Sequence, residues 1–173
     1  QDLYRSGELS ARIAVYFDEM PGIPMKSGLG DDWIRYGGYK LFMDGCIGPR
    51  TAALTEPYAD VPSERGILNH DLADLTERLT DLYKKGIQPQ IHAIGDEAID
   101  VIIQAYNALG VEQAEFGGYP LKLSHIQVCR PDQVKALAKM NVICDVQPAS
   151  VGTDAVISPS RLGPERLNWS FPF

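Results

Sequence analysis

The chain has 173 residues, with 16 Lys and Arg against 23 Asp and Glu, which gives a net charge of −7. This acidic balance argues against a nucleic-acid partner, because phosphate binding requires clustered Lys and Arg. No apolar run approaches the ~20 residues of a membrane span, so we expect no membrane partner. Three cysteines are too few for a disulfide scaffold, and they favour a reducing, cytoplasmic location.

Strands and helices are expected to alternate along most of the chain. The predicted strands are 12–17, 39–43, 87–94, 121–128 and 142–147. The predicted helices are 70–85, 97–109 and 131–140. Single helices between consecutive strands imply a parallel sheet with right-handed crossovers. The Gly- and Pro-rich segments 18–38 and 44–69 and the tail from 148 are predicted to be irregular.

The helix ends carry recognisable stop and start signals. Asn69 or Asp71 is suited to cap the first helix, and Gly86 is suited to end it in the left-handed conformation. Asp96 is expected to be the N-cap of the second helix, and Pro131 to occupy the first turn of the third.

Two of the three histidines lie at equivalent points of neighbouring βα units. His92 and His125 fall near the carboxyl ends of their strands, where parallel α/β folds bind ligands. One interpretation is a metal site, since imidazole is a common ligand for zinc and other divalent ions. The alternative is that both are interior histidines without a metal. His70, which opens a helix, is predicted to be a surface residue.

Lys40 and Arg50 each have a functional and a structural interpretation. Lys40 lies inside a strand, where a buried amine must be paired or modified. Arg50 lies in a glycine-rich loop, either gripping an anionic substrate group or simply solvated. A cysteine nucleophile is a competing hypothesis, but nothing in the sequence orients Cys46 or Cys129 toward a base.

Several motifs together resemble the YtcJ-like metal-dependent hydrolases (amidohydrolase 3 type) of the amidohydrolase superfamily. They occur in the family's order over nearly the whole chain, so that together they are specific although each alone is weak. The motifs are Lys40-Leu41-Phe42-Met43-Asp44-Gly45, Gly48, Arg50-Thr51-Ala52-Ala53-Leu54, Pro57-Tyr58, Gln90-Ile91-His92-Ala93-Ile94-Gly95-Asp96-Glu97-Ala98, Ser124-His125-Ile126-Gln127, Val146-Gln147-Pro148 and Arg161-Leu162-Gly163-Pro164-Glu165-Arg166.

The resemblance implies a (β/α)8 TIM barrel that hydrolyses C–N bonds of non-peptide amides with metal-activated water. By analogy Lys40 is the bridging fourth-strand ligand, as a carboxylated lysine, and His92 and His125 are the fifth- and sixth-strand ligands. The implied cofactor is a divalent metal, zinc by expectation, with one or two ions per complete site. The implied partner is a small-molecule amide substrate.

The chain also departs from the family pattern. The first-strand His-x-His pair and the last-strand catalytic Asp are missing, and Asp154 is interpreted as an acidic loop residue instead. A complete barrel takes about 250 residues, so we expect residues 1–173 to be one partial barrel domain, about strands three to seven, and a fragment of the enzyme. We therefore expect the isolated chain to be inactive.

An incomplete barrel would leave two open sheet edges and an exposed apolar inner face, from which we predict self-association. Two alternatives remain at this stage. One is a non-catalytic α/β binding or scaffold domain derived from such a barrel, in which the histidines have no ligand role. The other is a flavodoxin-like sheet with a different ligand, which predicts a closed, compact monomer.

Overall fold

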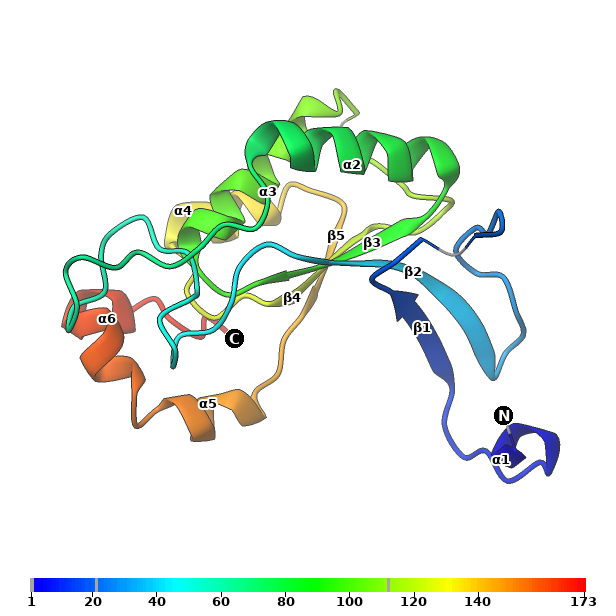
Figure 1. Cartoon of the computed structure of the whole chain (residues 1–173), viewed down its shortest axis with the longest axis horizontal. Coiled ribbons are helices and arrows are strands. Elements are labelled where there is room, and N and C mark those ends of the chain that lie inside the picture. Colours follow the sequence, from blue (N-terminus) through cyan, green and yellow to red (C-terminus); the bar gives the residue numbers. More distant parts are fainter. Residues whose placement is uncertain (1, 21, 112) are drawn as a thin grey trace.

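One open sheet of five parallel strands organises the chain (Figure 1). The computed structural model describes residues 2–20, 22–111 and 113–173. Each strand pairs with the next in chain order. The strands are β1 (Ile13–Phe17), β2 (Ile34–Phe42), β3 (Gln88–Ala93), β4 (Leu121–His125) and β5 (Val142–Asp145). This order confirms the predicted parallel α/β architecture, and it differs from the flavodoxin-like order, in which the second strand lies at the edge of the sheet.

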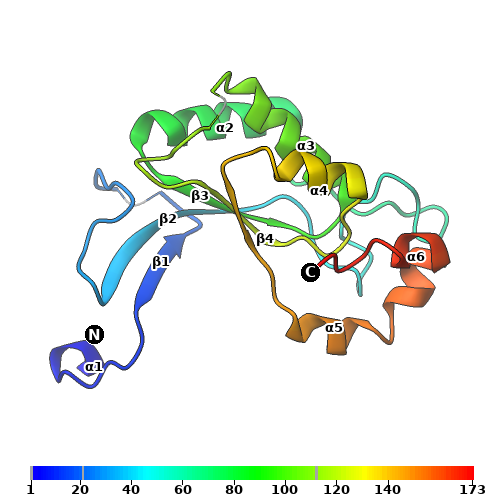
Figure 2. The same ribbon diagram turned by 180° about the vertical axis from the view of Figure 1, so that it is seen from behind.

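Three helices cover one face of the sheet, as Figures 1 and 2 show. They are α2 (Leu72–Lys85), α3 (Asp96–Ala108) and α4 (Pro131–Leu137). Leu41, Ile91 and Leu123 are paired across neighbouring strands and form one row on the covered face. They pack in a single core cluster with Leu79 of α2 and Ile102 of α3, both fully buried. This layer holds the strands in a fixed register.

The opposite face of the sheet is mostly polar. Lys40, Gln90 and Lys122 form one row across β2, β3 and β4, and His92 and Ser124 are paired in the next row. The same two rows also contain the exposed apolar side chains of Phe42 and Ile143. The expected apolar inner face is therefore found only in part, because polar and apolar side chains are mixed on it.

Local signals account for most of the element ends. The carboxylate of Asp71 accepts from the Asp74 N–H at 2.8 Å, and Gly86 ends α2 with φ 66°. Pro131 occupies the first turn of α4, as predicted. The prediction for Asp96 was wrong: Gly95 is the N-cap of α3, and Asp96 is its first residue. The Asp96 side chain instead makes long-range contacts, described below.

Two segments are more regular than the sequence indicates. β2 begins at Ile34, five residues earlier than predicted, and contains Gly38, where a Cβ would stand 1.9 Å from the carbonyl oxygen of Gln88. The tail from 148 contains α5 (Ala149–Asp154) and α6 (Ser158–Leu167), so its prediction as irregular was wrong. Proline fits the first turn of a helix, which lets Pro159 lie in α6. The short helix α1 (Asp2–Arg5) precedes β1.

Candidate metal centre

The carboxyl ends of β3 and β4 bring His92 and His125 together. Ala93, the residue after His92, pairs with His125 in the sheet. The two imidazole centroids are 4.4 Å apart, and the ring planes are inclined at 64°. The juxtaposition expected from the strand ends is therefore present.

His92 is held by the loop that follows β2. Its Nε2 lies 2.9 Å from the carbonyl oxygen of Gly45 and 3.5 Å from Oδ1 of Asp44. A carbonyl oxygen only accepts, so Nε2 carries the proton and Nδ1 keeps its lone pair. Burial lowers the pKa of His92 to about 4, against the Gly45 hydrogen bond and with help from the charges of His125 and Lys40. The ring is neutral near pH 7, the state that binds a metal.

His125 lies on an unusual backbone. His125 and Ile126 have φ angles of 82° and 54°, the left-handed region that residues with side chains seldom adopt. β4 consequently ends at His125, earlier than predicted. Burial and then the charge of Lys40 lower the pKa of His125, while Gln147 and Asp145 oppose the shift. The second imidazole is also biased toward its neutral form.

Lys40 belongs to the same neighbourhood. It pairs with Gln90 in the sheet, two residues before the pair Phe42 and His92. Its Nζ lies 5.0 Å above the Phe42 ring. Burial lowers the pKa of Lys40, Lys122 lowers it further, and Asp145 opposes both. Because the Lys40 charge acts on both imidazoles, these three candidate residues share one electrostatic environment.

Arg50 has a partner within the protein. Its Nε and Nη2 donate to the Asp60 carboxylate at 3.1 and 2.8 Å, and Arg161 of α6 contacts the same carboxylate. These arginines lower the pKa of Asp60 to about 2. The guanidinium of Arg50 thus helps to join its loop to α6 through Asp60. A substrate would have to compete with this ion pair.

Asp44 is a residue of the site to which sequence reasoning assigned no role. Its side chain is fully buried and accepts from the N–H groups of Ile94, Gly95 and Ala53 at 3.0, 2.7 and 3.0 Å. Burial raises its pKa to about 7, against these hydrogen bonds. Asp44 thus joins the loop after β2 to the backbone that follows His92. An acidic residue directly after the apolar run 41–43 was the available signal.

The donor set fits part of a metal centre. Two neutral imidazoles lie side by side, and Nδ1 of His92 is the nitrogen not engaged by Gly45. Nitrogen donors of this kind suit zinc and related divalent ions. Within residues 2–20, 22–111 and 113–173, no group of three or more His, Cys, Asp or Glu side chains is arranged to hold a metal ion. Further ligands would have to come from Lys40 or from outside these residues.

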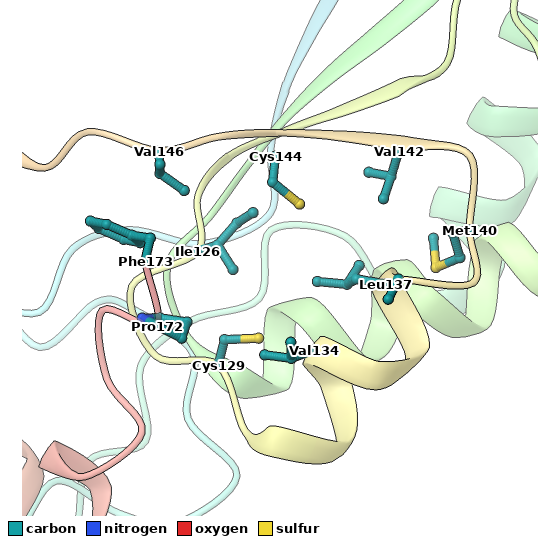
Figure 3. Close-up of a pocket in the computed structure, with 11 residues that line it drawn as sticks. Ile126, Cys129, Val134, Leu137, Met140, Val142, Cys144, Val146, Pro172 and Phe173 are labelled. Atoms are coloured by element: carbon teal, nitrogen blue, oxygen red, sulfur yellow. The ribbon is translucent and has the colours of Figure 1, made fainter.

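An apolar pocket of about 440 Å³ lies elsewhere (Figure 3). It is formed between β5, α4 and the C-terminal residues Pro172 and Phe173, with Cys129 and Cys144 among its lining side chains. Cys144 pairs with Leu123, which packs in the helix-covered core, so the pocket lies on the face opposite the polar row. It is therefore separate from the histidine pair.

Comparison with known proteins agrees with this geometry. A model of the amidohydrolase family matches residues 5–173. The chain is 34% identical over 143 residues to the Bacillus subtilis protein YtcJ, covering 83% of this chain and 26% of that protein. It is 30% identical over 141 residues to the protein LONG AFTER FAR-RED 3 of Arabidopsis thaliana, covering 82% of this chain and 24% of that protein. The chain thus spans about a quarter of the length of these relatives.

Two crystal structures share the fold closely. An uncharacterized metal-dependent hydrolase from Pyrococcus horikoshii OT3 superposes with a TM-score of 0.83 at 32% identity, covering 99% of this chain and 35% of that one. Its counterpart from Pyrococcus furiosus superposes with a TM-score of 0.82 at 29% identity, covering 98% of this chain and 35% of that one.

In the part of the chain that the structure describes, no helix combines the length and apolarity needed to cross a membrane.

Proposed function

Because this chain belongs to the amidohydrolase family, we propose that it supplies part of the metal centre of a hydrolase acting on C–N bonds of non-peptide amides. The observation that carries the proposal is the pair of neutral imidazoles, 4.4 Å apart at neighbouring strand ends. The crystal structures of similar fold are titled metal-dependent hydrolases, which supports the same chemistry.

His92 and His125 would be the metal ligands of this chain. The Gly45 carbonyl fixes the ring of His92. It selects the tautomer in which Nε2 carries the proton and the lone pair of Nδ1 is available to a metal. A bound divalent ion, zinc by expectation, would polarise the amide carbonyl and make a water molecule more acidic. The polar face around the pair, with Gln90 and Ser124, would order solvent or substrate beside it.

Lys40 is proposed as a third ligand after carboxylation. Carbamate formation requires the neutral amine, and burial together with Lys122 favours that form by lowering the pKa of Lys40. The product would be an anion with two oxygen donors, able to bridge one or two metal ions.

We propose that the isolated chain does not catalyse. The His-x-His pair and the final Asp of the family motif are missing from its sequence, so it has no general base to deprotonate the water. Incubation with N-acylated small amides is expected to give no turnover. Hydrolysis that a chelator abolishes would contradict this part of the proposal.

Metal binding tests the site directly. The chelator-treated chain is titrated with Zn2+ in a calorimeter, beside the double variant H92N/H125N and the control H70N. His70 is a suitable control because it lies at the start of α2, hydrogen-bonded to Asp74. We expect the double variant to lose at least about tenfold in affinity and H70N to bind like the parent chain. Equal binding by all three would favour the alternative of a non-catalytic scaffold domain.

Carboxylation of Lys40 has its own test. The chain is equilibrated with 13C-bicarbonate and Zn2+, and the carbamate carbon is sought by NMR. We expect a carbamate signal that K40Q removes and K85Q retains, since Lys85 lies in α2 on the other face of the sheet and pairs with Asp81. A signal that survives K40Q would exclude Lys40 as the modified residue.

A further inference from the structure

The connections that follow His92 and His125 run side by side. Ile126 donates its N–H to the carbonyl of Ala93 at 2.9 Å, and Val128 donates to the carbonyl of Ile94 at 2.8 Å. Each connection then leads into a helix, α3 after β3 and α4 after β4. The position of one imidazole relative to the other therefore depends on how these two connections are joined.

The connection after β4 starts in a strained conformation. His125 and Ile126 are consecutive residues with positive φ, and neither is glycine. Such conformations persist where the surrounding structure holds them, and they are common at functional sites. The hydrogen bonds of Ile126 and Val128 hold part of this connection, and a restraint at its far end would add to them.

Arg130 provides that restraint at the far end of the connection. Its Nη1 donates to Oδ2 of Asp96 at 3.0 Å, and its Nη2 donates to both oxygens of Asp100 at 2.8 and 2.9 Å. Asp96, only 1% exposed, is the first residue of α3 and lies four positions after His92. One guanidinium therefore links the connection after His125 to the connection after His92.

Gln133 and Thr55 extend the same network. The amide of Gln133 donates to the Asp96 carbonyl and to Asp100 Oδ1, both at 2.7 Å, and its Oε1 accepts from the Arg130 N–H. Asp96 also accepts from the N–H and the hydroxyl of Thr55, which lies in the same loop as Gly45. The loop that holds the His92 ring is thus tied to the same carboxylate.

We propose that Arg130, through Asp96 and Asp100, is a positioning residue that holds the strained His125–Ile126 turn so that both imidazoles face one metal ion. This inference rests on the proposed metal-binding function, but the arrangement of the two rings is defined without a metal. The planar guanidinium reaches two carboxylates at once, which a lysine ammonium does not reproduce with the same geometry.

The test compares R130K with R78K, a control that changes an arginine paired with Asp74 on α2. Two properties are measured on the whole chain: the nuclear Overhauser effect between the His92 and His125 ring protons without metal, and the dissociation constant for Zn2+. We expect R130K to remain folded by circular dichroism, to weaken the ring-to-ring signal and to bind Zn2+ about tenfold less tightly. R78K is expected to match the parent chain in both properties.

The outcomes separate this inference from the proposed function. A folded R130K with unchanged ring signal and Zn2+ affinity would overturn the positioning role and leave the metal site intact. A parent chain that binds no Zn2+, while R130K still loses the ring signal, would overturn the metal site and support the positioning role. If R130K does not fold, D96N is used, which removes the charged partner that Arg130 and Thr55 share; an unchanged ring signal in a folded D96N would overturn the positioning role.

Discussion

The imidazole of His92 lies against that of His125 at 4.4 Å, although 33 positions separate them in the chain. Both rings are partly withdrawn from water beside the positive charge of Lys40, which favours their neutral forms. The pair therefore combines proximity with the protonation state that a metal requires. Its properties lead to the first prediction.

The first prediction concerns the pH dependence of stability in the metal-free chain. Burial lowers the folded-state pKa of His92 to about 4 from 6.5, so between these values the unfolded chain binds a proton that the folded chain does not. Stability from His92 therefore falls as the pH falls through this window. Asp44 has the opposite sign, because its folded-state pKa is raised to about 7 from 3.8. In the parent chain, the pH dependence of stability from His92 and that from Asp44 therefore oppose each other.

The variant H92N should remove the contribution of His92 to the pH dependence of folding stability. We expect the stability of H92N relative to the parent chain to increase as the pH falls from 6.5 to 4. Urea unfolding at several pH values, with a chelator present, measures the difference. The exposed neutral variant N107A is the control, and its difference from the parent should not vary with pH. A pH-independent difference for H92N would contradict the lowered pKa.

The second prediction concerns the buried carboxylate of Asp44. D44N replaces one acceptor oxygen by an NH2 group, which cannot accept from the N–H groups of Gly95 and Ala53. Leaving a buried donor without a partner costs about 1–3 kcal/mol. We expect D44N to lose stability by that amount in urea unfolding, whereas the exposed control D18N changes it by less than about 0.5 kcal/mol. A neutral effect of D44N would mean that the site tolerates a rearranged loop.

The third prediction concerns the reactivity of the thiols. Cys129 is fully buried, and burial raises its pKa to about 12. Partial burial also raises the pKa of Cys46 and of Cys144, but both residues are exposed to a reagent. The thiolate is the reactive form, so a maleimide should modify Cys46 and Cys144 in the folded chain and reach Cys129 only after denaturation. Mass spectrometry of the peptides identifies the modified residues, and C129S should give the same native labelling. Rapid native labelling of Cys129 would show that the pocket between α4 and β5 opens.

The fourth prediction concerns self-association. β1 and β5 each pair with only one neighbour among the described strands, so each offers an open edge. We expect the sedimentation coefficient to increase with protein concentration. I143K places a charge on the β5 edge and should reduce association, while I67K adds the same charge on an exposed loop residue and should not. A strictly monomeric profile at all concentrations would exclude association through the edges.

Local sequence signals predicted the order of the five strands and of α2, α3 and α4, the end of α2 at Gly86 and the placement of His92 and His125 at strand ends. These features follow from signals within a few residues, namely apolar periodicity, caps and turn residues. The motif resemblance also assigned the family, which the match over residues 5–173 supports.

The contacts between polar side chains depend on tertiary packing. Asp96 looks like a helix cap locally, yet its partner Arg130 is 34 positions away and Thr55 is 41 positions away. The sequence around Arg50 leaves its guanidinium available to a substrate, yet in the fold Arg50 pairs with Asp60, which also contacts Arg161 of α6. Such contacts depend on how the helices and loops pack on the sheet, and no local pattern encodes that. The same packing gave Asp44 its buried position.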